Sequence, residues 1–287
     1  MTDAAPAPPF LRLGPETPAS PVILSVPHAG RDYSAALLAT ARVHRSVLEA
    51  LEDRFVDRLI WRAVQAGVTA FVAQVPRAEI DLNRDERELD GALIAGPLPA
   101  DRIESRRMRS GLGVIPSRLA GVGAIWKTRI ARAEFDRRLA EVHRPYHHAL
   151  AAALALARNR FGSAILLDCH SMPPRAQGDG AGAVVFGDRH GVTSAPELMA
   201  TALATARGMG WRAQCNEPYA GGHIVARHGR PARDVHAIQL EFCRSTYLDV
   251  TLSRPGPGFD RASALIAALV EALEARLLGG PCAVAAE

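Results

Sequence analysis

The hydrophobic pattern of this chain predicts short buried strands that alternate with helices. Segments rich in apolar and β-branched residues, each followed by turn-forming residues, predict strands. These segments are 21–27, 68–75, 164–173, 183–187 and 236–242. Apolar residues spaced three and four apart predict helices. The helical segments are 43–66, 135–150, 194–207 and 259–278, and Pro145 should kink or divide the second.

Composition places the chain among ordinary globular proteins. It has 287 residues, 48% of them hydrophobic and 22% charged, enough for one large domain or two small ones. No run approaches the eighteen or so apolar residues that a membrane span needs. Residues 1–20 are rich in Ala and Pro and lack the basic start of a secretory signal, so we expect a flexible tail there and a single folded domain over 21–280.

Charge and cysteine content exclude several functional classes. The net charge of +4 comes from scattered basic residues with few aromatics and no nucleic-acid motif, so we expect no nucleic-acid partner. Cys169, Cys215, Cys243 and Cys282 are far apart and form no Cys-x-x-Cys pair. This spacing indicates neither a disulfide framework nor a thiolate zinc site, and it fits a reducing cytoplasm.

Two histidines follow predicted strands at their carboxyl ends. Asp168, His170 and Ser171 end the strand over 164–173, and His28 ends the strand over 21–27. A neutral imidazole can ligate a divalent metal while a nearby acid fixes its tautomer, and two such histidines share one ion if their strands are neighbours. The alternative for each is a hydrogen-bonded histidine without a ligand.

Several carboxylates lie at positions predicted to be buried, where a charged group needs a cation or hydrogen-bond donors as partners. Asp53 and Asp57 lie one turn apart on the predicted helix, turned toward the protein, so either a metal or a buried arginine must compensate them. Glu241 stands among apolar neighbours, and burial should raise its pKa toward the range of a general base. The alternative for Glu241 is a salt bridge, with Arg244 near enough in sequence to supply it.

Other polar segments suggest a pocket. Residues 79–83 look strand-like, which would turn Asp81 and Asn83 to one side, and the Asn83-Arg84 pair suits a carboxylate-bearing substrate. The arginine-rich stretch 101–145 is expected to leave the sheet, as a lid or pocket wall or as solvated surface. The glycines of the turn at 216–222 permit close backbone approach to a ligand, and the alternative is a plain surface loop. Residues 178–182 are rich in glycine and are expected to form a flexible loop. His143, His147 and His148 are expected as packing or surface histidines, or as pocket residues.

Taken together, these segments resemble the N-formylglutamate amidohydrolase family over about 22–249. The resemblance rests on several motifs in the right order. They are Pro27-His28-Ala29-Gly30, Glu52-Asp53 with Val56-Asp57, Asp81-Leu82-Asn83-Arg84, Gly111-Leu112-Gly113-Val114-Ile115-Pro116, His143-Arg144-Pro145-Tyr146-His147, Asp168-Cys169-His170-Ser171-Met172-Pro173, Glu217-Pro218-Tyr219 with Gly221-Gly222, and Gln239-Leu240-Glu241. The chain departs from the expected pattern at Ser117, where we would look for arginine, and at His223, where we would look for an aromatic residue.

The resemblance implies a fold and a metal. The fold is a single α/β domain with a mixed, mostly parallel central sheet flanked by helices, similar to zinc carboxypeptidases and acylamino-acid deacylases. One zinc ion is implied, although other divalent metals are possible. His28 and His170 match the histidine ligands. Asp53 is our choice for the third ligand and Asp57 the second choice, because Arg31 stands where those carboxypeptidases have glutamate.

The same resemblance assigns roles to the remaining site residues. Glu241 is the general base and Arg31 helps zinc to stabilise the oxyanion. The substrate-binding residues are Asn83, Arg84, Tyr219 and Gly222. Asp168 orients the ring of His170, and Asp57 and Asp81 are further carboxylates behind the metal ligands.

The implied reaction is the hydrolysis of N-formyl-L-glutamate to formate and L-glutamate in cytoplasmic histidine degradation, by a monomer or small homo-oligomer. One alternative keeps the enzyme class but changes the substrate to another N-acyl amino acid or a glutamyl amide. Another is a non-catalytic carboxylate-binding protein. A serine or cysteine hydrolase is disfavoured because no Gly-x-Ser-x-Gly elbow occurs and strand neighbours point to opposite faces.

Overall fold

Seven strands form one sheet in the computed structural model, which describes residues 8–175 and 183–279. The order across the sheet is β1-β3-β2-β6-β9-β7-β8. All neighbouring pairs are parallel except β1 with β3 and β7 with β9. The strands are β1 (Phe10–Leu13), β2 (Val22–Val26), β3 (Thr69–Ala73), β6 (Ala164–Met172), β7 (Val184–Gly187), β8 (Ala213–Cys215) and β9 (Val235–Cys243). The predicted 178–182 loop and Cys282 lie outside the described residues.

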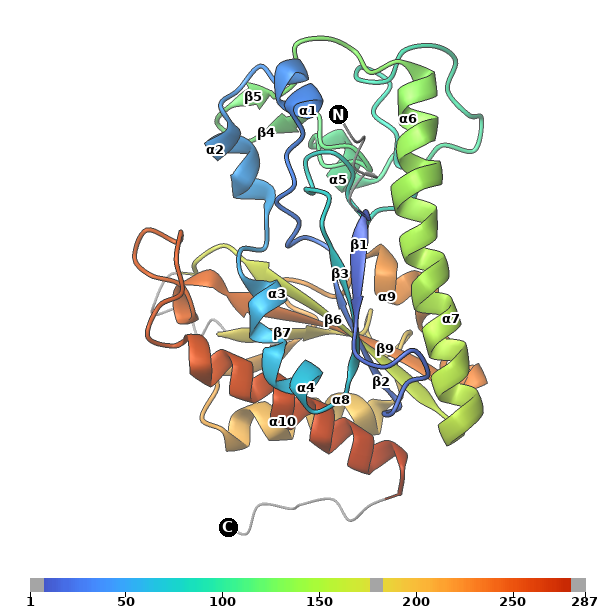
Figure 1. The fold of residues 1–287 in the computed structure, drawn as a ribbon, viewed down its shortest axis with the longest axis vertical. Coiled ribbons are helices and arrows are strands. Elements are labelled where there is room, and N and C mark those ends of the chain that lie inside the picture. Colours follow the sequence, from blue (N-terminus) through green and yellow to red (C-terminus); the bar gives the residue numbers. More distant parts are fainter. Residues whose placement is uncertain (1–7, 176–182, 280–287) are drawn as a thin grey trace, which may run out of the picture.

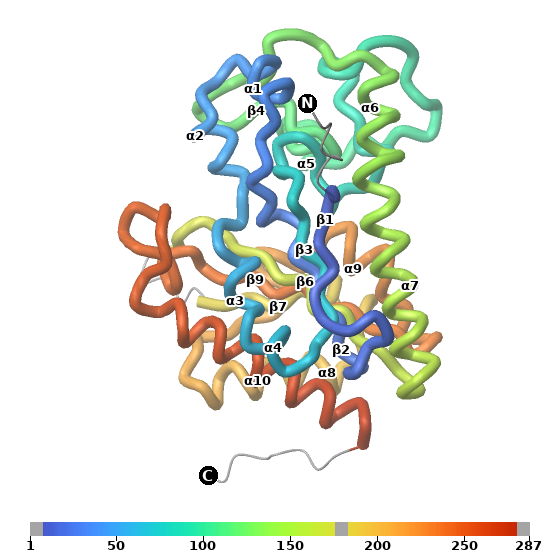
Figure 2. The backbone as a smooth tube through the Cα atoms, in the orientation of Figure 1, coloured from blue at the N-terminus to red at the C-terminus, as the bar shows by residue number. Residues whose placement is uncertain are grey.

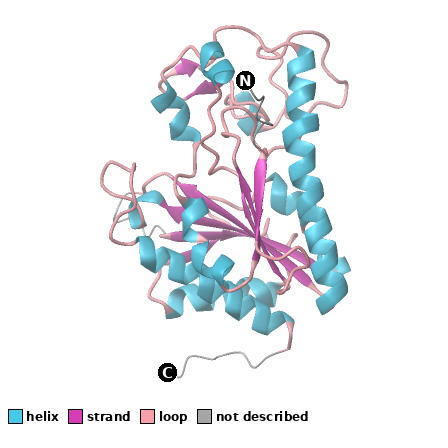
Figure 3. Ribbon diagram, viewed as in Figure 1, coloured by secondary structure: helices cyan, strands magenta, loops and turns pink. Residues whose placement is uncertain are grey.

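Helices cover both faces of the sheet (Figures 1 and 3). One face carries α3 (Val56–Leu59), α4 (Trp61–Gln65), α8 (Pro196–Gly208) and α10 (Phe259–Leu277). The other face carries α7 (Arg144–Phe161) and α9 (His223–His228). This arrangement is the single α/β domain with a mixed, mostly parallel sheet that the resemblance implied, and none of the described helices has the length and apolarity that crossing a membrane requires.

A smaller region lies beyond the carboxyl ends of β2 and β3 (Figure 2). Its elements are α1 (Ala35–Thr40), α2 (Arg45–Leu48), the 3-10 turn η1 (Glu49–Leu51), α5 (Arg106–Arg109), the ribbon β4 (Arg118–Leu119) with β5 (Gly123–Ala124), and α6 (Arg132–Arg138). The predicted excursion over 101–145 therefore does leave the sheet, and it returns through α7.

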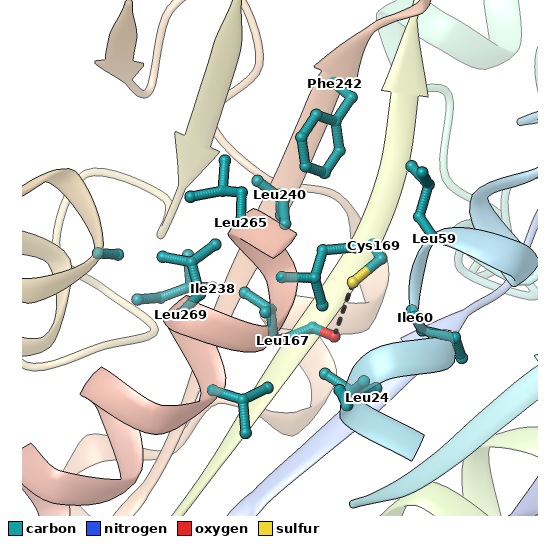
Figure 4. Packing of buried hydrophobic residues seen from close by; sticks show 14 of the residues in the cluster. Leu24, Leu59, Ile60, Leu167, Cys169, Ile238, Leu240, Phe242, Leu265 and Leu269 are labelled. Carbon is teal, nitrogen blue, oxygen red and sulfur yellow. Dashed lines mark hydrogen bonds between the residues drawn. The ribbon is translucent and has the colours of Figure 1, made fainter. Parts of the chain in front are cut away.

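Strand alternation separates core residues from polar ones. On β6, Leu167 and Cys169 enter the apolar layer against α3, α4 and α10, whereas Asp168 and His170 point to the other face. Figure 4 shows Cys169 surrounded by Leu59, Ile60 and Leu240. Burial raises the pKa of the Cys169 thiol well above its usual range, so this cysteine is a core residue and not a nucleophile.

The predicted helix over 43–66 is broken. The chain leaves η1 at Glu52 in an extended conformation and turns at Phe55 with φ 60° before α3 begins. Leu48 and Leu51 belong to the apolar cluster on one face of the sheet, and Val56 and Leu59 to the cluster on the opposite face. One straight helix cannot serve both layers, so packing overrides the helical pattern.

Other predictions of local structure were wrong or only partly right. Within the expected tail, residues 10–13 form the edge strand β1 and Ser20 is buried, while residues 1–7 are not described. Residues 79–83 form turns instead of a strand. The helix is not divided near Pro145, because residues 132–161 stay helical throughout, but a π-helical segment, η2 (Leu139–His143), precedes α7. Proline supplies no N–H and crowds the preceding turn, which the wider π turn accommodates.

Candidate metal centre and active-site pocket

Three buried ligand atoms meet at the carboxyl ends of β2 and β6, where the strand order reverses direction. His28 follows β2, His170 lies on β6, and Asp53 comes from the broken segment before α3. His170 Nδ1 lies 3.2 Å from His28 Nδ1 and 3.0 Å from Asp53 Oδ2, and His28 Nδ1 lies 3.3 Å from the same oxygen. A tetrahedral zinc with ligands at its usual distances separates them by about 3.3 Å, so the spacing fits one such ion.

The far nitrogen of each ring is held by its own carboxylate. His28 Nε2 lies 2.7 Å from Asp81 Oδ1, and His170 Nε2 lies 2.8 Å from Asp168 Oδ2. A carboxylate accepts hydrogen bonds, so both Nε2 atoms donate and both Nδ1 atoms of the neutral rings present lone pairs. Two lone pairs and a carboxylate oxygen facing one point repel one another unless a cation lies between them. The residues therefore fit a divalent metal.

Ionisation in this cluster follows from its charges. Burial alone would raise the pKa of Asp53, but the adjacent imidazoles of His170 and His28 hold it well below its usual range. Burial would lower the pKa of His170, yet Asp168 and Asp53 raise it well above its usual range. A proton on His170 therefore competes with a metal ion for this site.

The second oxygen of Asp53 is held by two residues that the sequence analysis did not assign to the site. Asp53 Oδ1 accepts hydrogen bonds from Ser171 Oγ at 3.1 Å and from Arg244 Nη2 at 3.2 Å, and Arg244 Nε donates to Ser171 Oγ at 3.0 Å. Arg244 was considered as a salt-bridge partner of Glu241, which is wrong. The 3-10 turn after β9 directs it to Asp53 instead.

Glu241 faces the same pocket from the neighbouring strand. Its register partner on β6 is His170. Burial raises the pKa of Glu241 to about 7, with His170 opposing and Asp53 adding to the shift. Gln239, also missed as a site residue, donates from Nε2 to Glu241 Oε1 at 2.7 Å. Gln239 lies two residues earlier on the same strand, and that spacing is the signal that could have revealed it.

The pocket beside this cluster has a volume of about 610 Å³ and is rich in arginine. The guanidinium groups along its wall belong to Arg77, Arg84, Arg106, Arg107, Arg189 and Arg244. Arg77 pairs with Asp81 at 2.8 Å, whereas Arg106 and Arg107 on α5 are exposed and form no salt bridge with another described residue. Unpaired cations at the wall of a pocket suit an acidic ligand.

All four predicted substrate-binding residues line the pocket, and Asn83, Arg84 and Gly222 also form hydrogen bonds within the protein. Asn83 Oδ1 accepts from Ile224 N at 2.8 Å, and Asn83 Nδ2 lies 3.2 Å from Gln239 Oε1. A Cβ on Gly222 would lie 2.4 Å from Asn83 Oδ1, so this position allows the close approach of Asn83. Arg84 donates from Nε to Leu112 O at 3.0 Å. Tyr219 packs beside Arg107.

The structure does not bring Arg31 and Asp57 to the pocket. They form an ion pair at 2.5 Å, and the Arg31 guanidinium also stacks 5.1 Å from the centre of the Phe55 ring. Neither residue is part of the pocket wall. The break at residues 52–55 separates Asp57 from Asp53, which explains why the predicted stacking of the two carboxylates fails and why Arg31 finds its partner there.

The fold and this site define a single-domain α/β enzyme with a His-Asp-His cluster, suited to hold a metal ion, at the carboxyl ends of its strands. The chain belongs to the N-formylglutamate amidohydrolase family, whose model matches residues 20–248. Membership makes it a hydrolase that acts on an amide bond, as the resemblance implied.

Named relatives agree with this assignment. The chain is 30% identical over 235 residues to an N-formylglutamate deformylase of Pseudomonas aeruginosa, covering 80% of this chain and 82% of that one. It is also 30% identical over 238 residues to an N-formylglutamate deformylase of Pseudomonas putida, with 80% and 83% coverage. A crystal structure of N-formylglutamate amidohydrolase from Ralstonia eutropha JMP134 superposes with a TM-score of 0.85 at 30% identity, covering 94% of this chain and 98% of that one.

Proposed function

We propose that this enzyme is a zinc-dependent hydrolase that cleaves N-formyl-L-glutamate to formate and L-glutamate. The observation that carries the metal is the mutual approach of His28 Nδ1, His170 Nδ1 and Asp53 Oδ2, each within 3.3 Å of the others. The names of the relatives support the substrate. A zinc ion held by these residues would supply a Lewis acid and would lower the pKa of a water molecule at the site.

Glu241 is the residue suited to move the proton. A carboxylate with a pKa near neutrality accepts a proton from the attacking water and returns it to the departing amine nitrogen. Gln239 holds one Glu241 oxygen, which leaves the other free to face the substrate. Gln239 is itself fixed by Gly222 N, which donates to its Oε1 at 2.8 Å.

Substrate recognition follows from the cations of the pocket wall. N-formyl-L-glutamate carries two carboxylates, so two separate positive groups are needed. We assign one carboxylate to Arg84, in keeping with the family motif, and the other to Arg107 on α5. Arg107 is exposed and lies 5.9 Å from the Tyr219 ring centre, where it borders the pocket without a carboxylate partner among the described residues.

We further propose that the enzyme acts in histidine degradation in the cytoplasm. Membership of the N-formylglutamate amidohydrolase family supports the proposed role in histidine degradation. Free thiols at Cys169, Cys215 and Cys243 are in keeping with a reducing compartment.

The decisive experiment measures formate release from N-formyl-L-glutamate before and after chelation, with zinc added back, beside N-acetyl-L-glutamate and N-formyl-L-aspartate. We expect release to stop on chelation, to return with zinc, and to be fastest for N-formyl-L-glutamate. Release that persists without metal would reject the zinc mechanism. Equal rates on the three substrates would reject the specificity for N-formylglutamate.

A further inference from the structure

A second group of histidines lies behind the loop that supports the candidate metal centre. His143 and His147 are four residues apart at the junction of η2 and α7, and His223 and His228 are the two ends of α9. His143, His147 and His228 are buried, and the side chain of His223 is 14% exposed. The mechanism proposed above uses none of these four rings.

Backbone carbonyls fix the tautomers of two of these rings. His143 Nε2 lies 2.9 Å from Arg84 O, and His147 Nε2 lies 3.0 Å from Leu82 O. A carbonyl oxygen can only accept, so in both neutral rings Nε2 carries the hydrogen and Nδ1 carries a lone pair. His147 Nδ1 lies 3.0 Å from His228 Nε2, which serves as the donor in that pair, so a metal ion at His147 Nδ1 would have to displace His228.

Two nitrogens of the group are buried without a hydrogen-bond partner, namely His143 Nδ1 and His223 Nε2. Buried polar atoms are nearly always paired, so two orphaned ring nitrogens in one cluster require an explanation. One ligand atom from each of His143, His147 and His223 lies within 4.8 Å of the others. The three rings would have to turn toward one another on metal binding, because ligands around a tetrahedral metal are about 3.3 Å apart.

We infer that His143, His147 and His223 form a second metal site, for a transition-metal ion of the zinc class bound by three imidazoles. Ligating histidines usually donate their other N–H to a carbonyl or carboxylate, as His143 and His147 do here. Asp85 Oδ2 lies 3.9 Å from His223 Nδ1 and is the carboxylate placed to orient that ring.

Burial favours the neutral, metal-binding form of these rings. Burial lowers the pKa of His223 to about 4, with Asp85 opposing the shift, and burial lowers the pKa of His147 well below its usual range. Neutral imidazole is the form that binds metal. Arg227 is a cation facing the group and weakens cation binding, so this site should bind more weakly than the His28 site, which has a carboxylate ligand.

The second site would act on the first through one loop. The carbonyls that hold His143 and His147 belong to Arg84 and Leu82, on either side of Asn83. In the same loop Asp81 binds His28, and Asn83 binds Gln239, which holds Glu241. A metal ion behind the loop would therefore fix the supports of the catalytic residues without touching substrate.

The test counts Co²⁺ bound per chain after dialysis, by elemental analysis and by the visible absorption of tetrahedral cobalt. We expect two equivalents for the wild-type protein and the loss of one equivalent in His223→Gln. His148→Gln is the matched control, because this exposed histidine on α7 belongs to neither site, and it should bind as much as the wild type.

His170→Gln separates this inference from the proposed function, since it removes the first site and leaves the second intact. It should retain one equivalent, and the double variant His170→Gln with His223→Gln should retain none. A cobalt count unchanged by His223→Gln, or no cobalt in His170→Gln, would overturn the second site. An unchanged count in His170→Gln would instead overturn the first. The His170→Gln measurement leaves the second cluster unaltered, so it decides the question even if His223→Gln does not fold.

Discussion

His28 and His170 of the candidate metal centre each pair with a separate carboxylate through Nε2. Asp81 is fully buried, and Arg77 and His28 nevertheless keep its pKa well below its usual range, so it stays charged behind His28. Asp168 holds His170 in the same way and is fixed by Ser25, whose Oγ donates to Asp168 Oδ1 at 2.7 Å. Such fixed partners orient the rings before any metal binds and raise their basicity as ligands.

The pKa of Glu241 predicts the acid side of the activity profile. As a general base Glu241 works only when ionised, and burial raises its pKa to about 7. Activity should therefore fall as the pH drops below about 7 and level off above it. The measurement is kcat/KM against pH with the zinc-loaded enzyme. A profile that stays level well below neutrality would contradict this role.

Replacing the base should reduce turnover without removing the metal. In Glu241→Gln the side chain keeps its size but cannot accept the proton, so kcat should fall about 10²- to 10⁴-fold with zinc content unchanged. Glu271→Gln is the matched control, because Glu271 is exposed on α10, and it should behave as the wild type. A Glu241→Gln enzyme with nearly full kcat would show that another residue carries the proton.

At the scale of elements, two adjacent strands carry the chemistry on one face only. His170 on β6 and Glu241 on β9 are register partners. Cys169 and Leu240, the residues just before them, point to the opposite face and enter its apolar layer. The period of two along a strand therefore keeps the polar residues of the pocket apart from the core. The α9 helix borders the pocket, and Gly222, which precedes its first residue, packs on Asn83.

This contact predicts a contrast between two glycines. Gly222→Ala places a methyl group 2.4 Å from Asn83 Oδ1, so Asn83 and Gln239 must move, and the free energy of unfolding should fall by about 1–3 kcal/mol with a lower kcat. Gly208→Ala is the matched control, because its methyl group would meet nothing within 4 Å at the end of α8. It should be neutral or stabilising by up to about 1 kcal/mol.

Urea unfolding followed by circular dichroism gives both free energies. Equal effects of the two substitutions would show that the Gly222 contact with Asn83 relaxes without strain. A loss of stability in Gly222→Ala with unchanged kcat would show that the packing of Gly222 stabilises the fold but does not position Gln239 and Glu241.

For the whole molecule, the candidate metal centre joins segments that are far apart in sequence. His28, Asp53 and His170 come from β2, the broken segment and β6, so a bound ion crosslinks the sheet to the chain that covers it. An ion that binds only the folded chain stabilises it by about 3–4 kcal/mol when free metal exceeds its dissociation constant 100- to 1,000-fold. Chelation should lower the free energy of unfolding by that amount, and zinc should restore it.

The control for this effect is Asp53→Asn, which weakens the first site and should reduce the response to chelator. Urea midpoints with and without EDTA provide the measurement. A wild-type midpoint that does not move on chelation would show that no ion contributes to the stability of the folded protein.

Much of this protein was decided by its sequence. Apolar runs predicted β2, β3, β6, β7 and β9, because a strand buried on both faces has few other compositions. The Asp168-x-His170 spacing and the placement of His28 predicted side chains at the strand ends, since strand geometry is local. The ordered motifs predicted the family, which the match over residues 20–248 confirms.

Tertiary structure alone decided the rest. The break at residues 52–55 arises because Leu48 and Val56 pack on opposite faces of the sheet, and no local pattern reveals which face a residue will meet. The same break brings Asp53 to His28 and His170, pairs Asp57 with Arg31, and leaves Arg244 to hold Asp53. Long-range partners of charged side chains depend on where distant segments meet, and sequence spacing carries that information only within one strand or helix.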